Sequence, residues 1–218
     1  MLANAENGDS IEAHMVGTEG AALLLEACGS GVGASTCNVQ SDGRAWRAPA
    51  ALCRELSTTN ADFARRTFEL LELQLAEARQ SALCQGLHHV ERRLARWLLE
   101  SSDRAAGRNP MPLTQEFIAA MLGVQRTTVN SFVSRLQKDG LIGYRRGKIE
   151  LLDMPGLERR LCECRAAIVE QRGRLQLEPC AGAVADRKAE VSATEGPRLS
   201  RPTSRAAIQA NRSPQLTA

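Results

Sequence analysis

The residue types that suit chemistry gather between residues 114 and 148. Short polar side chains and one arginine recur at helical spacing from Arg126 to Ser134, and three basic residues follow between Arg145 and Lys148. Arginine can donate two parallel hydrogen bonds to guanine, and asparagine can pair with the edge of adenine. Helix N-termini and basic loops suit phosphate oxygens. The pattern therefore predicts a surface that reads double-stranded DNA.

Two sets of candidate residues follow from this interpretation. Side chains at the start of a helix over residues 126–138 would contact base edges in a major groove: Gln125, Arg126, Thr127, Asn130 and Ser131. Side chains around them would contact phosphates and hold the protein in register: Thr114, Gln115, Ser134, Arg145, Arg146 and Lys148. The alternative is that the polar residues form only a solvated helix face.

Two short helices and a hairpin must position these side chains. Thr114 predicts the N-cap of a helix over "QEFIAAML", and Gly123 predicts its left-handed end. A second helix, over residues 126–138, has an apolar stripe on the face opposite its polar side chains: Val129, Phe132, Val133 and Leu136. Gly140 ends it, and "LIGYRRGKIELLD" indicates two strands around a tight turn at Arg146–Gly147. Together these elements predict a winged helix-turn-helix.

A long helix is predicted ahead of this unit, over residues 57–87. Neither Gly nor Pro occurs from Ser57 to Gln85, and Ser57, Thr58 and Thr59 offer N-caps. Apolar residues recur at alternating steps of three and four, which is the heptad pattern of a helix seam: Ala64, Phe68, Leu71, Leu75, Ala78 and Ala82. The pattern favours a dimerisation helix, and hence a homodimer, over an ordinary amphipathic core helix.

The remaining chain divides around these elements, and the predicted fold class is α+β. Residues 1–56 hold short, loosely alternating apolar pieces such as "IEAHMVG", "STCNVQ" and "RAWRAP", which predict a few strands and too small a core to stand alone. The DNA-binding domain is expected over residues 88–170, with a last helix that begins at Pro155 or Gly156. Residues 171–218 lack periodicity and are expected to be a disordered, mildly basic tail.

Composition and charge agree with a cytoplasmic polyanion-binding protein that does not enter a membrane. The net charge is +3, but residues 1–55 hold three Lys and Arg against seven Asp and Glu, whereas residues 88–156 hold eleven against seven. No apolar run has the length of a transmembrane helix, and the N-terminus lacks the features of a signal peptide. The seven scattered cysteines are odd in number and predict reduced thiols rather than a disulfide framework.

From about residue 57 to residue 165, the chain resembles the C-terminal half of the Crp/Fnr family of bacterial transcription regulators. The resemblance is carried by "LHHVERRLARWLL", by "PLTQEFIAAMLGVQRTTVNSFVSRLQKDGLIGYRRGKIELLD" and by "LERRLCECRAA". It implies a homodimer joined along residues 58–87, a recognition helix from Arg126, and a pseudo-palindromic site with half-sites about one helical turn apart. It also implies RNA polymerase as a partner.

The chain departs from the family in two places. Well-known members begin the recognition helix with Arg-Glu and place a second Arg one turn later, whereas this chain has Arg126-Thr127 and then Ser131. Its preferred DNA site should therefore differ. Residues 9–56 resemble only the second half of the family's β-roll, and the arginine expected near Ser35 to neutralise a cyclic phosphate is absent. Because a buried phosphate without a basic partner is costly, we expect a truncated sensor that binds no cyclic nucleotide and no cofactor.

Other functions are less well supported by the residues. No catalytic triad, paired carboxylates or phosphate loop occurs, so no enzyme and no catalytic residue are predicted. Cys84 and His88 are one helical turn apart but lack an evident third ligand, and Cys162 and Cys164 would point apart on a helix, so no metal is expected. Two alternatives stay open. The chain could be an interaction protein that heterodimerises with a full-length relative, or a thiol- or metal-responsive regulator.

Overall fold

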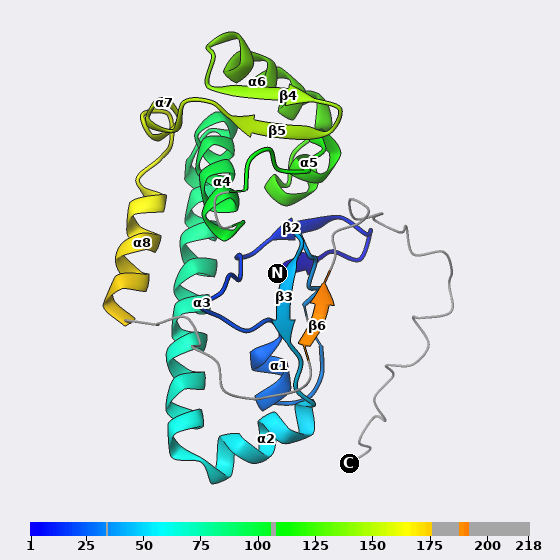
Figure 1. Cartoon of the computed structure of the whole chain (residues 1–218), viewed down its shortest axis with the longest axis vertical. Coiled ribbons are helices and arrows are strands. Elements are labelled where there is room, and N and C mark those ends of the chain that lie inside the picture. The colour runs from blue at the N-terminus through cyan, green and yellow to red at the C-terminus, as the bar shows by residue number, and fades with distance from the viewer. Residues whose placement is uncertain (34, 106–107, 176–187, 192–218) are drawn as a thin grey trace, which may run out of the picture.

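The computed structural model describes residues 1–33, 35–105, 108–175 and 188–191. Its longest helix, α3 (Ala61–Leu87), runs along most of the molecule. The predicted winged helix lies at one end of α3 and α2 (Ala50–Thr59) lies at the other, as Figure 1 shows. Two-stranded sheets and helices combine, which confirms the predicted α+β class. Among the described residues, no helix is both long and apolar enough to cross a membrane.

The winged-helix unit is built around α4 (Val90–Arg104), with α5 (Gln115–Leu122) and α6 (Arg126–Lys138) packed beside it. The Trp97 and Phe117 rings meet edge to face, with centroids 6.1 Å apart. The largest side chains that are fully buried around them come from all three helices and both wing strands: Leu94, Leu98, Leu99, Ile118, Met121, Val129, Leu136, Ile142 and Ile149. This core fixes the orientation of α6.

The capping residues predicted from the sequence lie at the ends of α5 and α6. The Thr114 side chain accepts a hydrogen bond from the Phe117 N–H at 3.1 Å, and Gly123 ends α5 with φ 62°. Gly140 follows α6 with φ 71°, and the Leu141 N–H reaches back to the Leu136 carbonyl at 2.9 Å. These caps satisfy backbone groups that a helix end leaves free, so the turn between the two helices is well defined.

The wing is the predicted hairpin of β4 (Ile142–Arg145) and β5 (Lys148–Leu151). Both turn residues, Arg146 and Gly147, have positive φ, as a two-residue turn with the twist of the strands requires. Met111 and Ile149 exchange backbone hydrogen bonds of 2.7 and 2.9 Å on the other edge of β5. Strand β5 is thus held on both edges, by β4 and by Met111.

The long helix begins later than predicted. Residues 57–59 belong to α2, and Asn60 caps α3 instead, its side chain accepting a hydrogen bond from the Phe63 N–H at 2.9 Å. The backbone of Asn60 is extended (φ −124°, ψ 107°), which separates the two helices. The N-cap prediction at Ser57, Thr58 and Thr59 was therefore wrong, because Asn60 offers the same capping oxygen at the break itself.

The N-terminal region contains fewer strands than expected between residues 9 and 56. It has β2 (Ser10–Glu12), α1 (Leu24–Cys28) and β3 (Gly43–Trp46), whereas "STCNVQ" contributes only a bridge from Thr36 to Leu2. The partner of β2 is β1 (Leu2–Asn4), at the start of the chain. Hydrogen bonds between distant segments, which local alternation does not reveal, explain the difference.

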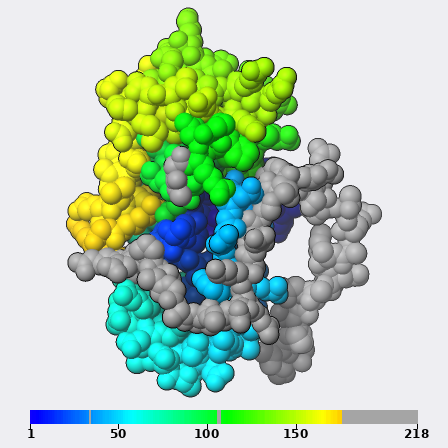
Figure 2. Space-filling view, in the orientation of Figure 1, coloured from blue at the N-terminus to red at the C-terminus, as the bar shows by residue number. Residues whose placement is uncertain are grey.

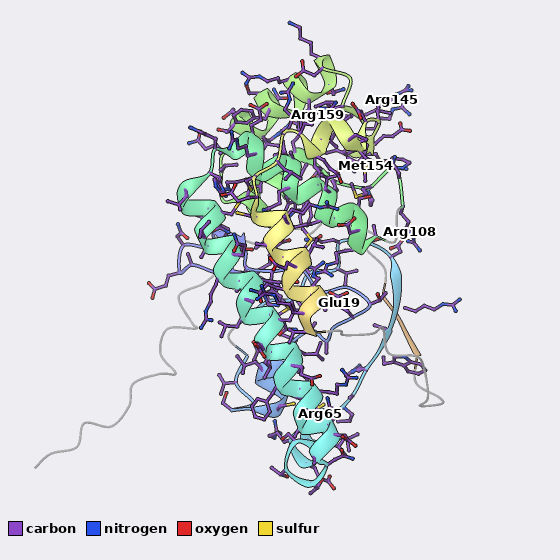
Figure 3. The ribbon with its side chains drawn as sticks, turned by 90° about the vertical axis from the view of Figure 1, so that its left-hand side faces the viewer. Glu19, Arg65, Arg108, Arg145, Met154 and Arg159 are labelled. Atoms are coloured by element: carbon purple, nitrogen blue, oxygen red, sulfur yellow. The ribbon has the colours of Figure 1, made fainter. Side chains whose placement is uncertain are left out.

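The C-terminal part differs from the single helix that was expected. It forms α7 (Met154–Glu158) and α8 (Cys164–Leu175), separated by a non-helical stretch at 159–163. Helix α8 lies alongside α3 (Figure 3). The expected disordered tail over residues 171–218 was wrong in two places: residues 171–175 belong to α8, and β6 (Lys188–Val191) pairs antiparallel with β3. Residues 176–187 and 192–218 of that tail lie outside the described residues.

Candidate nucleic-acid interface

Helix α6 separates a buried face from an exposed one. Val129, Val133 and Leu136 have no exposed surface and pack into the core of the unit. The five residues predicted to read bases are all exposed and lie at the N-terminal half of α6 or on its N-cap: Gln125, Arg126, Thr127, Asn130 and Ser131. The structure therefore brings this predicted set together on one surface.

A hydrogen bond joins the candidate base-reading face to the preceding helix. Gln115, at the start of α5, donates from Nε2 to Asn130 Oδ1 at 3.1 Å. The bond orients the Asn130 amide, so that its Nδ2 group is the donor left for a ligand. Sequence reasoning assigned Gln115 to phosphates and did not anticipate this contact, since the two residues lie on different helices.

The predicted phosphate-binding residues surround that face. Thr114 is exposed at the N-terminus of α5, and a Cβ placed on Gly147 would lie 3.3 Å from its Cγ2 atom, so the wing turn touches this helix end. Arg145, Arg146 and Lys148 are exposed on the wing, and Figure 3 shows Arg145 at the winged-helix end of the molecule. Ser134, on α6, is exposed as well.

The cations of this surface differ from Arg135 and Arg160, two other arginines of the unit. Arg135 and Arg160 both bond to Glu91, and Arg160 also bonds to Asp139. Among the described residues, no ion pair involves the four cations of the candidate interface: Arg126, Arg145, Arg146 and Lys148. These four charges are therefore available to a polyanion.

The predicted seam on α3 is largely open to solvent. The seam has three large side chains: Phe68 is 72% exposed, Leu75 is 50% exposed, and Leu71 is half-buried. The smaller members are exposed or half-buried: Ala64, Ala78 and Ala82. Another face of α3, including Leu73, is buried inside the molecule. Large apolar side chains in a row on an exposed helix face are typical of an interface.

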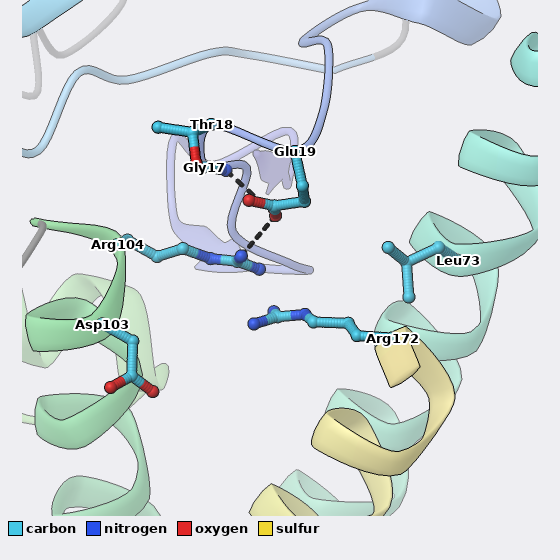
Figure 4. A pocket seen from close by; sticks show the side chains of 7 residues that line it. All are labelled: Gly17, Thr18, Glu19, Leu73, Asp103, Arg104 and Arg172. Carbon is cyan, nitrogen blue, oxygen red and sulfur yellow. Dashed lines mark hydrogen bonds and ion pairs between the residues drawn. The ribbon is translucent and has the colours of Figure 1, made fainter. Parts of the chain in front are cut away.

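A small pocket lies where the N-terminal segment meets α3, α4 and α8 (Figure 4). Arg104 on α4 bonds to Glu19 and, at 3.3 Å, to Glu77, while Arg172 on α8 bonds to the same Glu77 oxygen at 2.6 Å. Glu19 also accepts a hydrogen bond from the Gly17 N–H at 3.2 Å. The two arginines of the pocket are thus already paired with carboxyl groups of the chain itself.

Burial changes the acidity of two carboxyl groups near this region. Burial raises the pKa of Glu77 to about 7, although Arg172 opposes the change. Burial likewise raises the pKa of Glu12 to about 7. Glu12 accepts hydrogen bonds from Trp97 Nε1 at 3.0 Å and Gln40 Nε2 at 2.6 Å, so β2 is held against α4 by a polar contact inside an apolar core. Sequence reasoning did not find this contact, because its members lie far apart in the chain.

Comparisons with known proteins agree with the geometry of this unit. Residues 92–160 match the Crp-like helix-turn-helix domain. This match confirms the resemblance to Crp/Fnr family transcriptional regulators for that part of the chain. No curated protein matches the chain significantly.

Solved structures that match part of the chain include regulators described as members of the Crp/Fnr or Crp family. A putative Crp/Fnr regulator from Eubacterium rectale is 27% identical, covers 54% of this chain and 52% of its own, and has a TM-score of 0.44. A Crp/Fnr regulator from Thermus thermophilus is 28% identical, with coverages of 49% and 56% and a TM-score of 0.44. FixK2 from Bradyrhizobium japonicum is 23% identical, with coverages of 52% and 59% and a TM-score of 0.49. The chain spans about half the length of these structures.

Proposed function

From the Crp-like helix-turn-helix domain over residues 92–160, we propose that this chain is a dimeric, sequence-specific DNA-binding regulator of transcription. Helix α6 enters the major groove, and the wing rests on the phosphate backbone. The observation that carries the proposal is the exposed polar face of α6, whose opposite face is fully buried. A regulator of this kind acts together with RNA polymerase, which we include as a proposed partner.

Base reading is assigned to the N-terminal half of α6. Arg126 is the first residue of the helix and suits guanine O6 and N7, while Asn130 lies one turn further and suits adenine. Gln115 holds the Asn130 amide in one orientation, so less side-chain freedom is lost when the amide meets a base. Gln125, Thr127 and Ser131 complete the proposed set of base contacts.

Phosphate contacts are assigned to the rim of this face. The α5 N-terminus offers unpaired backbone N–H groups beside Thr114 and Gln115, which suit an anion. Arg145, Arg146 and Lys148 supply positive charge from the wing. Ser134 adds a hydroxyl group along α6. These contacts would set the register of α6 on the duplex and add salt-dependent affinity.

Dimerisation is assigned to the exposed seam of α3, within the proposed segment 57–87. Two copies joined along this seam would place two α6 helices for half-sites about one helical turn apart. The N-terminal region 1–56 is proposed to form part of a sensor domain. Because the arginines of its pocket are held by Glu19 and Glu77, we propose that DNA binding needs no anionic effector such as a cyclic nucleotide.

Selection of bound duplexes from a random DNA library tests the proposal. The purified chain, without added ligand, should enrich a palindromic consensus, and the double variant Arg126→Ala/Asn130→Ala should lose that consensus. Arg65→Ala is the matched control, because Arg65 is exposed at the far end of α3 (Figure 3). Failure of the unmodified chain to enrich any sequence would overturn autonomous DNA reading.

A second outcome of the same selection would favour the alternative function, in which the chain acts by forming heterodimers with a full-length relative. The exposed seam could also pair with a full-length relative that carries its own heptad helix. Enrichment that appears only when such a relative is added, with an asymmetric consensus, would assign the chain to heterodimers. A palindrome selected by the chain alone would exclude that it needs such a partner.

A further inference from the structure

Four side chains that are far apart in the sequence meet at the junction between α3 and α8. Cys84 is in the last turn of α3, His88 directly follows α3, Cys162 precedes α8, and Cys164 is the first residue of α8. One ligand atom from each lies within 4.8 Å of the other three. The Cys84 and Cys162 Sγ atoms are 3.5 Å apart, and Cys164 Sγ is 3.4 Å from His88 Nδ1.

The non-helical stretch before α8 makes this convergence possible. Cys162 and Cys164 would point apart if both lay on a helix, which was the reason for expecting no metal. That reason fails, because helix α7 ends at Glu158 and α8 begins only at Cys164. The chain between them turns, so that both thiols face Cys84 and His88.

We propose that Cys84, His88, Cys162 and Cys164 bind one zinc ion in a closed, structural site. Four sulfur and nitrogen ligands are the usual set for structural zinc. Zinc–sulfur bonds of about 2.3 Å imply ligand separations of about 3.8 Å around a tetrahedron, close to the two separations given above. The cysteines are no more than 1% exposed, which leaves no open position for a substrate.

The neighbours of the cluster suit a metal as well. The Nε2 atom of His88 lies 3.2 Å from a Glu163 carboxylate oxygen, so the carboxylate fixes the ring with Nδ1 toward the thiols. This carboxylate–histidine–metal arrangement is common around zinc. In this arrangement Glu163, which lies between the two cysteines in the sequence, contacts Nε2 of the His88 ring rather than the thiols.

Charge compensation is available from α4. Zinc with three thiolates and a neutral histidine carries a net charge of −1, which needs a positive partner when buried. Arg93 and Arg96 are buried and close enough to Cys84 and Cys162 to interact with them electrostatically. Arg96 is paired with Glu100 at 2.8 Å, whereas Arg93, among the described residues, has no ion pair. The Arg93 charge is therefore free to balance the site.

The position of the site indicates that the bound zinc would cross-link neighbouring helices. It ties the beginning of α8 to the end of α3 and to the junction that leads into α4. Zinc would thus fix the angle between the proposed dimerisation helix and the proposed DNA-binding unit. The inference itself concerns metal binding, which can be measured without DNA, so it stands or falls separately from the proposed function.

Metal analysis of the purified full-length chain tests the site. The chain, prepared under reducing conditions without chelator, should contain one zinc per chain, and cobalt replacing the zinc should give thiolate-to-cobalt charge-transfer absorption. Cys84→Ser, Cys162→Ser and Cys164→Ser should each weaken zinc binding at least tenfold, whereas Cys37→Ser, which changes an exposed cysteine, should not.

Two results would overturn the proposal, and a further variant protects it against misfolding. The first result that overturns the zinc site is a chain that contains no metal and gives no cobalt signal. The second is a stable Cys84–Cys162 disulfide in the protein isolated without added oxidant. If the cysteine variants fail to fold, His88→Cys keeps four ligands. It should retain zinc, with a cobalt spectrum that gains a fourth thiolate.

Discussion

At the scale of single residues, the α6 face combines two kinds of side chain with different roles. Arg126 and Asn130 can recognise specific base edges, whereas the wing cations can meet any sequence. The local environment supports the distinction, since Asn130 is oriented by Gln115, while the wing cations are exposed at and beside a two-residue turn. Substitutions at the two kinds of position should therefore have different signatures.

Replacement of Arg126 should change sequence preference. Arg126→Ala removes two possible hydrogen bonds to one base, so discrimination at one position of each half-site should fall by about 1–3 kcal/mol. Competition binding with duplexes that differ at single positions measures this change. An unaltered preference profile in the variant would show that Arg126 does not read a base.

Replacement of Arg146 should instead weaken binding to all sequences alike. Arg146→Ala removes one phosphate contact, so the slope of log affinity against log salt should become shallower by about 1. Titrations at several salt concentrations with a specific and an unrelated duplex provide the comparison. A loss confined to the specific duplex would contradict a phosphate role for this residue.

At the scale of elements, α3 is a long helix with two unlike faces. One face packs inside the molecule through residues such as Leu73, and the other exposes Phe68 and Leu75. Twenty-seven residues of α helix extend over about 40 Å. A face of this length can bury several heptad layers against a second copy, as a stable parallel dimer requires.

Charges placed on the seam should separate the two copies. Phe68→Glu together with Leu75→Glu would bury four like charges in a dimer, so the dimer dissociation constant should rise at least tenfold, which is about 1.4 kcal/mol. Sedimentation equilibrium measures the constant. Val169→Glu on α8, which also charges an exposed apolar position, is the control and should leave it unchanged. A double variant that remains as dimeric as the control would exclude this seam.

Elements defined by neighbouring residues could be predicted from the sequence, and those defined by distant residues could not. The caps at Thr114 and Gly123 and the turn at Arg146–Gly147 depend on local backbone chemistry, and the structure contains all three. The pairing of β1 with β2 and the break between α7 and α8 depend on tertiary contacts. The same limit applies to the cysteine cluster, since Cys84 and Cys162 are separated by 78 positions.

At the scale of the whole molecule, the N-terminal segment is packed against the winged-helix unit rather than tethered to it. In the space-filling view of Figure 2, the N-terminal residues, in blue, lie directly beneath the green surface of that unit. Leu2 and Met15 belong to the same buried core as Trp97 and Ile118. The described part of the N-terminal region therefore contributes to the stability of the DNA-binding unit itself.

This packing should make stability depend on pH through Glu12. Its pKa of about 7 in the folded chain lies above its ordinary value of 4.5, so folding takes up a proton and stability falls as pH rises through this range. Glu77 acts in the same direction. His14 opposes them, because burial lowers its pKa to about 4 and makes folding release a proton. The effect of His14 falls mainly in the range below its ordinary pKa of 6.5, so near pH 7 the two carboxyl groups dominate among these three, and they lower stability as pH rises.

Glu12→Gln should therefore stabilise the protein at high pH. The variant cannot ionise, so its free energy of unfolding at pH 8 should exceed that of the unmodified chain by on the order of 1–3 kcal/mol, and the difference should shrink toward pH 5. Urea unfolding at both pH values measures it. Glu6→Gln, at an exposed position, is the control. Equal pH slopes for Glu12→Gln and the control would rule out Glu12 as the titrating group.

The crowding at Gly123 shows how closely the first residues of the chain and the turn between α5 and α6 constrain each other. The turn needs a positive φ there, which glycine adopts without strain and asparagine tolerates better than most other residues. A Cβ at this position, however, would lie only 2.5 Å from Ile11 Cδ1 in β2. Any side chain at position 123 therefore requires the end of the Ile11 side chain to move. A smaller side chain at position 11 would remove this contact, so the two positions should be coupled in a double-mutant cycle.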